Sequence, residues 1–176
     1  MSEFAKHFRV VRGAPVDVST VATRADELYA GKSAAKAVIK ENSKAIASLA
    51  HKLYAQSDRS VLIVLQGMDT SGKDGSTSAI LGRTPPLNVY VKSFKAPSKA
   101  ELAHDYLWRV HAACPRAGQI GVFNRSHYED VLVVKVREFV SAAAIENRYA
   151  QINDFERHLT QNGTVVLKIM LHISHE

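Results

Sequence analysis

Apolar residues gather in four short runs along the chain, and each run predicts a β-strand. Residues 60–66 read "SVLIVLQ", a run with β-branched side chains that is typical of a strand buried on both faces of a parallel sheet. The same character recurs in residues 88–94, 119–124 and 164–173. We therefore expect four strands.

Helices are predicted before and between these strands. Apolar residues recur at helical spacing over residues 33–55 and 142–161. A third helix is expected over residues 72–82, and a Ser-x-x-Glu capping box begins a fourth over residues 98–113. The segment 126–139 stays open between two alternatives: "VLVVKV" favours a strand, whereas its position after "SHYED" suits a short helix.

The alternation of strands and helices from residue 60 onward defines the expected fold class. It predicts an α/β fold with right-handed crossovers, in which a parallel sheet carries helices on both faces. Residues 1–32 contain Gly13 and Pro15 and are expected to form an N-terminal arm. Residues 33–176 are expected to form one core domain.

Composition narrows the class of protein. The chain has 176 residues, a net charge of +6 and a pI near 9.5, which suggests either a polyanionic partner or an ordinary solvated basic surface. Cys114 is the single cysteine, so an internal disulfide and a cysteine zinc cluster are excluded, and a cytoplasmic location is expected. No stretch is apolar enough for a membrane helix or a signal peptide, so no membrane partner is expected.

The stretch "QGMDTSGKDGST" at residues 66–77 carries the clearest chemistry. Gly67, Gly72 and Lys73 have the spacing of a phosphate-binding loop, in which glycines let several backbone N–H groups converge on one anion. The following helix adds its positive N-terminal end, and the lysine reaches the terminal phosphates. The expected phosphate-binding residues here are Gly67, Thr70, Ser71, Gly72, Lys73, Asp74 and Gly75.

Two aspartates set this loop apart. Asp74 stands where such loops usually carry Ser or Thr, and in the first turn of a helix it also complements the helix dipole. Asp69 inside the loop would repel phosphate unless a cation lay between them, so we expect it to bind Mg²⁺, a hard cation that prefers oxygen ligands. The alternative for Asp69 is local hydrogen bonding within the turn.

Four blocks of the sequence together resemble the second family of polyphosphate kinases, the polyphosphate:nucleotide phosphotransferases. They are "GMDTSGKDG" (67–75), "SFKAPS" (93–98), "HDYLWRVH" (104–111) and "GVFNRSHYEDVLVVKV" (121–136). The resemblance implies a three-layer P-loop kinase-like fold. It also implies Mg²⁺-dependent phosphoryl transfer between inorganic polyphosphate and a nucleoside mono- or diphosphate, AMP or ADP, without a covalent enzyme intermediate.

The resemblance also implies roles for individual residues. Asp69, Lys73 and Arg125 are the expected catalytic residues. Asp69, Glu129 and Asp130 are the expected metal ligands. Glu129 or Asp130 is expected in this role because Asn124, which carries no charge, stands where some relatives have aspartate. Lys95 and Arg109 are expected near the phosphates. Alternatively, Lys95 is a solvated loop lysine and Arg109 pairs with Asp105, four residues back on the same helix.

Relatives of this family continue beyond "LKIMLHIS" into lid helices that carry further arginines. The sequence therefore predicts a core that lacks these helices, with weak or absent catalysis, retained phosphate binding and association into a homo-oligomer through exposed apolar surface. Two alternative functions stay open: an ATP-dependent small-molecule kinase and a catalytically defective phosphate- or nucleotide-binding fragment. Nucleic acid is not an expected partner, because the basic residues do not cluster with aromatics.

Overall fold

The computed structural model describes residues 6–11, 13–24, 28–136 and 141–174. The predicted arm, the open segment 126–139 and the predicted core each include a few residues outside this set. The division into an arm and a core stays a prediction. Within the described part of the arm, the 3-10 helix η1 spans Val18–Thr20, and its N-cap Asp17 accepts a hydrogen bond from the backbone N–H of Ser19.

A four-stranded, fully parallel sheet forms the centre of the fold. The strands are β1 (Ser60–Gly67), β2 (Val89–Ser93), β3 (Ile120–Asn124) and β4 (Thr164–Leu171), in the order β2-β3-β1-β4. All four strands were predicted, with ends that differ by at most two residues. After β1 the chain forms the edge strand β2, then places β3 between β2 and β1, and finally adds β4 on the other side of β1, so the crossovers that leave the neighbouring strands β1 and β3 run in opposite directions.

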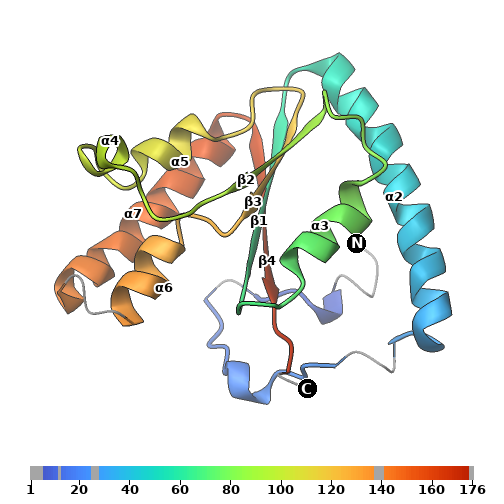
Figure 1. Ribbon diagram of the computed structural model, residues 1–176, viewed down its shortest axis with the longest axis horizontal. Helices are drawn as coiled ribbons and strands as arrows, with labels where there is room; N and C mark the ends of the chain where they lie inside the picture. The colour runs from blue at the N-terminus through green and yellow to red at the C-terminus, as the bar shows by residue number, and fades with distance from the viewer. Residues whose placement is uncertain (1–5, 12, 25–27, 137–140, 175–176) are drawn as a thin grey trace.

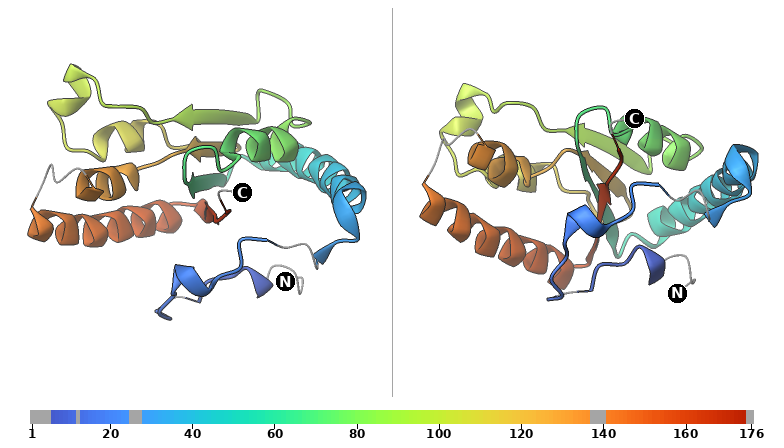
Figure 2. Two further views of the ribbon diagram at one scale, coloured as in Figure 1. Left: turned by 60° about the horizontal axis from the view of Figure 1, so that its bottom comes forward. Right: turned by 90° about the horizontal axis from the view of Figure 1, so that it is seen from below.

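Helices cover both faces of this sheet, which confirms the predicted fold class. On one face lie α2 (Gly31–Gln56) and α3 (Lys73–Leu81). On the other lie α5 (Trp108–Ala112), α6 (Glu129–Val136) and α7 (Ala142–Gln161), as Figures 1 and 2 show. The open segment after "SHYED" is thus helical where the structure describes it.

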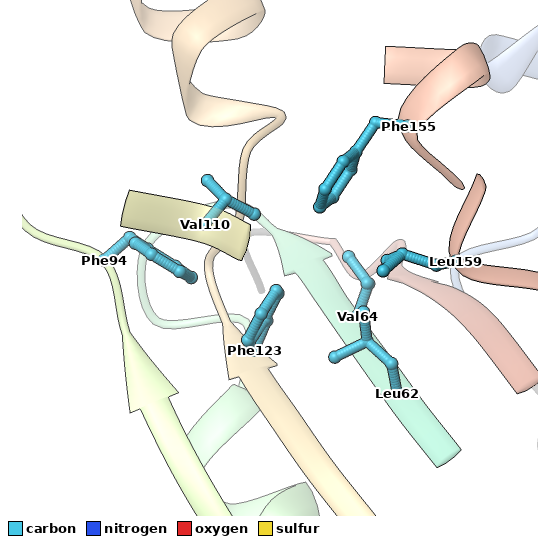
Figure 3. Close-up of a cluster of buried hydrophobic side chains, with 7 residues drawn as sticks. All are labelled: Leu62, Val64, Phe94, Val110, Phe123, Phe155 and Leu159. Carbon is cyan, nitrogen blue, oxygen red and sulfur yellow. The ribbon is translucent and has the colours of Figure 1, made fainter. Parts of the chain in front are cut away.

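Alternate residues of the strands build a separate core on each face. Leu62 and Val64 of β1 face α5 and α7, where they join Phe123 and Phe155 in the larger cluster (Figure 3). Ile63 and Leu65 point the other way and pack with Leu81 beneath α2 and α3. This two-sided burial is the physical reason why β1 and β3 read as continuous apolar runs.

One predicted helix is wrong in its extent. The segment 98–113 forms two short helices, α4 (Lys99–Leu102) and α5, rather than one. The capping box of Ser98 and Glu101 is present as predicted. Asp105 interrupts the helix, since its side-chain oxygen accepts a hydrogen bond from the N–H of Leu107 at 3.0 Å and thereby offers the backbone a turn instead.

Strand β4 lies at one edge of the sheet and is only partly covered. Val165, Leu167 and Ile169 follow the register of β1 residues that face α2 and α3, yet each remains exposed. Among the described residues, no helix combines the length and the apolar character needed to cross a bilayer. The cytoplasmic location stays a prediction.

Candidate functional site

Three strand ends meet at one cavity of about 610 Å³. Because all strands are parallel, their carboxyl ends lie at the same edge, and ligands of open α/β sheets gather there, where the strand order reverses. The loop after β1 supplies most of the lining, from Asp69 to Gly75. The segment after β2 and the end of β3 supply the rest: Ser93, Phe94, Lys95, Ala96, Asn124 and Arg125.

Backbone geometry shapes the loop around this cavity. Gly72 has φ +84° and caps α3, so the first turn of that helix begins at the cavity wall. Thr70 also adopts a left-handed conformation, with φ +67°. At Gly67 a Cβ would lie 2.9 Å from the carbonyl oxygen of Leu171 and 2.5 Å from Ser71 Oγ, so only glycine fits. The loop therefore has the tight turn and the helix N-terminus that anion binding requires.

Lys73 is buried against the loop and is part of the cavity lining. Its Nζ donates hydrogen bonds to the carbonyl oxygens of Gly67 and Met68, both at 2.8 Å, and to Ser71 Oγ at 3.3 Å. These three bonds hold the ammonium group in place and satisfy all of its protons. A phosphate that accepts a hydrogen bond from Lys73 must replace one of these partners, and the contact to Ser71 is the longest.

Opposite charges are paired in the lining of the cavity. Arg125 Nη2 lies 2.5 Å from Asp69 Oδ1, and the two side chains are 42% and 84% exposed. Asn124 Nδ2 donates a hydrogen bond to Asp74 Oδ1. Asp74 lies in the first turn of α3, as predicted from the helix dipole. The loop after β1 is thus tied to the end of β3 by two side-chain contacts.

Arg125 itself has unusual backbone geometry. Its φ is +64°, in the left-handed region that non-glycine residues rarely occupy. Its N–H donates to the carbonyl oxygen of Leu65 at 3.2 Å, which continues the sheet one residue beyond β3. Strained residues of this kind cluster at functional sites, because the surrounding structure has to hold them in place.

Arg109 and Asp130 lie outside the cavity and bind each other. Arg109 Nη2 is 3.5 Å from Asp130 Oδ2, with the two side chains 9% and 16% exposed. Burial raises the pKa of Asp130, and Arg109 and Arg148 act against this rise. Arg109 Nη1 also donates to the carbonyl oxygen of Lys95 at 2.8 Å. Arg109 therefore supports the wall of the cavity from behind, and its salt-bridge partner is Asp130 rather than Asp105.

The predicted metal ligands do not converge. Asp69 lines the cavity, whereas Glu129 and Asp130 stand at the start of α6 and are not part of its lining. Among the residues that the structure describes, no three His, Cys, Asp or Glu side chains form a group that can hold a metal ion. A site built from all three carboxylates is thus not assembled here, and the tertiary reason is the salt bridge that holds Asp130 against Arg109.

Some residues around the site escaped the sequence analysis. Ser93, Phe94 and Ala96 line the cavity together with Lys95. Glu156 and Lys168 form an ion pair beside the residues that follow Arg125, with Lys168 Nζ 2.6 Å from Glu156 Oε2 and the two side chains 11% and 48% exposed. A lysine in the middle of the apolar run 164–173 was the one available signal. Burial raises the pKa of the Cys114 thiol to about 11, which makes a reactive thiolate unfavourable there.

The parallel sheet, the glycine loop after β1 and the lysine beneath it define a P-loop kinase-like protein. The comparisons with known proteins specify the family. The sequence model described as "Polyphosphate kinase 2 (PPK2)" matches residues 29–176. This chain therefore belongs to the polyphosphate kinase 2 family, which confirms the resemblance seen in the sequence.

Individual relatives agree with this assignment. An "AMP/ADP-polyphosphate phosphotransferase" of Meiothermus ruber is 46% identical over 144 residues, which are 82% of this chain and 54% of the relative. An "ADP-polyphosphate phosphotransferase" of Rhodopseudomonas palustris is 38% identical over 181 residues, 96% of this chain and 63% of the relative. The chain thus spans between 54% and 63% of the lengths of these two relatives.

A solved structure shows the same fold. The crystal structure of Polyphosphate Kinase 2 from Arthrobacter aurescens TC1 superimposes with a TM-score of 0.90 at 40% sequence identity. The match covers 97% of this chain and 61% of that one. The arrangement of strands and helices described above is therefore that of the family.

Proposed function

We propose that this chain binds inorganic polyphosphate and transfers a phosphoryl group between it and AMP or ADP. The observation that carries the proposal is the convergence of the glycine loop, Lys73 and Arg125 on one cavity at the carboxyl edge of the sheet. The names of the relatives from M. ruber and R. palustris support the substrate class. These names do not agree on a single acceptor, so both nucleotides are tested below.

The chemistry follows from the charges around the cavity. Phosphoryl transfer has a loose transition state with charge spread over three equatorial oxygens, so an enzyme mainly positions the groups and neutralises them. We assign this role to the loop N–H groups, Lys73 and Arg125, and Lys95 lines the same cavity. One strong group of this kind contributes about 3–4 kcal/mol to lowering the barrier.

We propose Mg²⁺ as the cofactor, with Asp69 as its protein ligand. The donor set of the cavity fits a hard cation, because the loop offers the Asp69 and Asp74 carboxylates and the hydroxyls of Thr70 and Ser71. When bound, Mg²⁺ would offset the repulsion between these carboxylates and the phosphates. Glu129 does not line the cavity, and we therefore assign it no part in the step.

Polyphosphate is a linear polyanion, and its binding should depend on salt as nucleic-acid binding does. Three cationic side chains, Lys73, Lys95 and Arg125, line the cavity against two carboxylates. Lys92 and Lys99 flank the segment that carries Lys95, and we propose that they bind the chain beyond the cavity. Affinity for polyphosphate should accordingly fall steeply as ionic strength rises.

A turnover assay tests the proposal. The purified chain is mixed with Mg²⁺, long-chain polyphosphate and either AMP or ADP, and formation of the next higher nucleotide is measured. Lys73→Ala should abolish product, because it removes the cation beneath the loop. Lys52→Ala is the matched control, since this exposed lysine of α2 lies near the amino-terminal edge of the sheet, away from the cavity.

The outcomes separate the candidate functions. Product that disappears in Lys73→Ala but persists in Lys52→Ala supports the transferase and identifies the better acceptor. Polyphosphate binding without product supports a phosphate-binding fragment. Product with ATP as donor and none with polyphosphate supports an ordinary small-molecule kinase and contradicts the proposal.

We also propose that the chain forms a homo-oligomer. Val165, Leu167 and Ile169 expose an apolar row on β4, and contiguous apolar surface of this kind marks association sites. Light scattering after gel filtration should give a mass above the 19.3 kDa of one chain. Leu167→Lys should lower that mass if the row is the contact, and a monomeric parent chain would contradict the proposal.

A further inference from the structure

A partly buried polar network lies next to the segment that carries Arg125, and none of its members lines the cavity. Its centre is Glu156 of α7, whose side chain is only 11% exposed. The Tyr128 hydroxyl donates a hydrogen bond to Glu156 Oε1 at 2.9 Å, and His127 Nε2 lies 3.3 Å from the same oxygen. Lys168 of β4 donates to Glu156 Oε2 at 2.6 Å and to the Tyr128 hydroxyl at 3.0 Å.

The network includes the residues that directly follow Arg125 and holds them by hydrogen bonds. His127 is fully buried, with no exposed surface, and its other ring nitrogen, Nδ1, has no hydrogen-bond partner. Ser126 is equally buried; its hydroxyl accepts from the N–H of Tyr128 at 3.1 Å and from Gln66 Nε2 at 3.4 Å. Residues 126–128 are therefore fixed from α7, β4 and β1 at once.

The start of the same segment lines the cavity. Asn124 contacts Asp74, and Arg125 contacts Asp69, so both hold the loop after β1. Arg125 has to keep its left-handed φ of +64° while it does so. A residue in such a conformation stays there only when its neighbours fix it, and residues 126–128 are the neighbours on its carboxyl side.

Stability alone does not account for the network. Burying the Glu156 carboxylate costs desolvation energy that an ion pair offsets only in part, and its partner Lys168 is 48% exposed, so that the pair itself contributes little to stability. The network therefore needs another explanation, and its contacts supply one, since two of its three partners to Glu156 are the second and third residues after Arg125.

We propose that Glu156 is a positioning residue for Arg125. Through His127 and Tyr128, and with its charge balanced by Lys168, it holds residues 126–128 so that the guanidinium of Arg125 stays at the phosphate cavity. The inference rests on the proposed function only for the consequence in catalysis. The effect of Glu156 on the position of residues 124–128 does not depend on catalysis and is measured separately.

The first test is hydrogen exchange, which needs no activity. Glu156→Gln keeps the shape of the side chain but removes the charge that binds Lys168. Exchange protection should fall in residues 124–128 while protection of β1 and α3 is kept. Asp154→Asn is the matched control, because Asp154 lies on the same helix, is exposed and pairs only locally with Arg157. It should leave residues 124–128 unchanged.

The second test is kinetic. A displacement of about 1 Å at a positioned group can lower a rate by about 100-fold. Glu156→Gln should lower kcat by that order with little change in KM for polyphosphate, because Arg125 acts mainly on the transition state. Glu156→Asp, which keeps the charge, should recover part of kcat. A merely structural role would reduce the folded fraction without this separation of kcat from KM.

A double variant covers the case in which Glu156→Gln folds poorly. Glu156→Gln with Lys168→Met removes both charges and leaves no unpaired ion. The proposal is supported if the double variant recovers thermal stability while residues 124–128 still lack protection from hydrogen exchange. Recovered stability with full protection and full kcat would overturn it, since Glu156 would then only neutralise Lys168. Unchanged exchange in a folded Glu156→Gln would overturn it as well. If the parent chain shows no turnover, the proposed function fails, and the exchange data alone decide the positional claim.

Discussion

Arg125 Nη2 lies 2.5 Å from Asp69 Oδ1, and this ion pair joins the end of β3 to the glycine loop after β1. Each partner neutralises the other at the wall of the cavity. A phosphate group that binds there competes with Asp69 for the guanidinium, and a cation competes with Arg125 for the carboxylate. The pair is therefore a natural place to test the proposed site.

Asp69→Asn should have opposite effects on binding and on turnover. Without metal, tripolyphosphate should bind more tightly, because a repelling carboxylate is gone and Arg125 is released. With Mg²⁺, kcat should fall by about 10²–10³-fold, the usual cost of losing one electrostatic group. Calorimetry in the presence of a chelator and the turnover assay measure the two effects. Asp58→Asn, at the amino-terminal end of β1, is the control, and an unchanged Mg²⁺ dependence in Asp69→Asn would refute the metal role.

Arg109→Ala should act mainly on stability. Arg109 and Asp130 are 9% and 16% exposed, so removing the arginine leaves a buried carboxylate unpaired. Breaking a buried pair in this way costs about 3–5 kcal/mol of unfolding free energy. Urea denaturation measures the loss, and Arg109→Met with Asp130→Leu should restore much of it. Unchanged stability with weakened polyphosphate binding would instead support the direct phosphate contact that the resemblance implied.

Gly67→Ala should lower the stability of the fold, whereas Gly75→Ala should raise it. A Cβ at Gly67 meets the Leu171 carbonyl oxygen at 2.9 Å, and overpacking of this kind costs about 1–3 kcal/mol. At Gly75, within α3, a Cβ meets nothing within 4 Å, and replacing a helical glycine gains about 0.5–1 kcal/mol. Thermal unfolding separates the two. Weaker polyphosphate binding by a stabilised Gly75→Ala would show that phosphate approaches this backbone closely, whereas equal destabilisation by both would contradict the loop geometry.

Glu156 should make the stability of the fold depend on pH in the acidic range. Burial raises the pKa of Glu156, but hydrogen bonds from His127, Lys168 and Tyr128 and the charge of Lys168 outweigh it, so the net pKa lies below the ordinary 4.5. A lowered carboxyl pKa contributes stability that is present above 4.5 and is lost as the pH falls through the folded value. Denaturation across this range should show a steeper loss in the parent chain than in Glu156→Gln. Equal slopes would contradict the role assigned to this carboxylate.

The phosphate loop and the strands were predictable because their causes are local. Glycine spacing, a lysine at the start of a helix and continuous apolar runs are properties of neighbouring residues, and parallel topology then brings the strand ends together. The capping box at Ser98 was equally local. The break near Asp105 was not foreseen, because a side-chain hydrogen bond to the backbone two residues away competed with an otherwise suitable helical pattern.

The partners of the charged side chains depended on the tertiary structure. Arg109 had a helical neighbour at the right spacing in Asp105, yet it pairs with Asp130, since burial between α5 and α6 makes an unpaired carboxylate costly there. Glu156 and Lys168 likewise give no sign in the sequence that they meet beside the residues that follow Arg125. By itself, then, the sequence determined the fold class and the glycine-rich loop after β1, because backbone freedom and side-chain polarity act locally. Only the tertiary structure decided which charges face the cavity and which hold its walls, because these pairings join residues that are far apart in the chain.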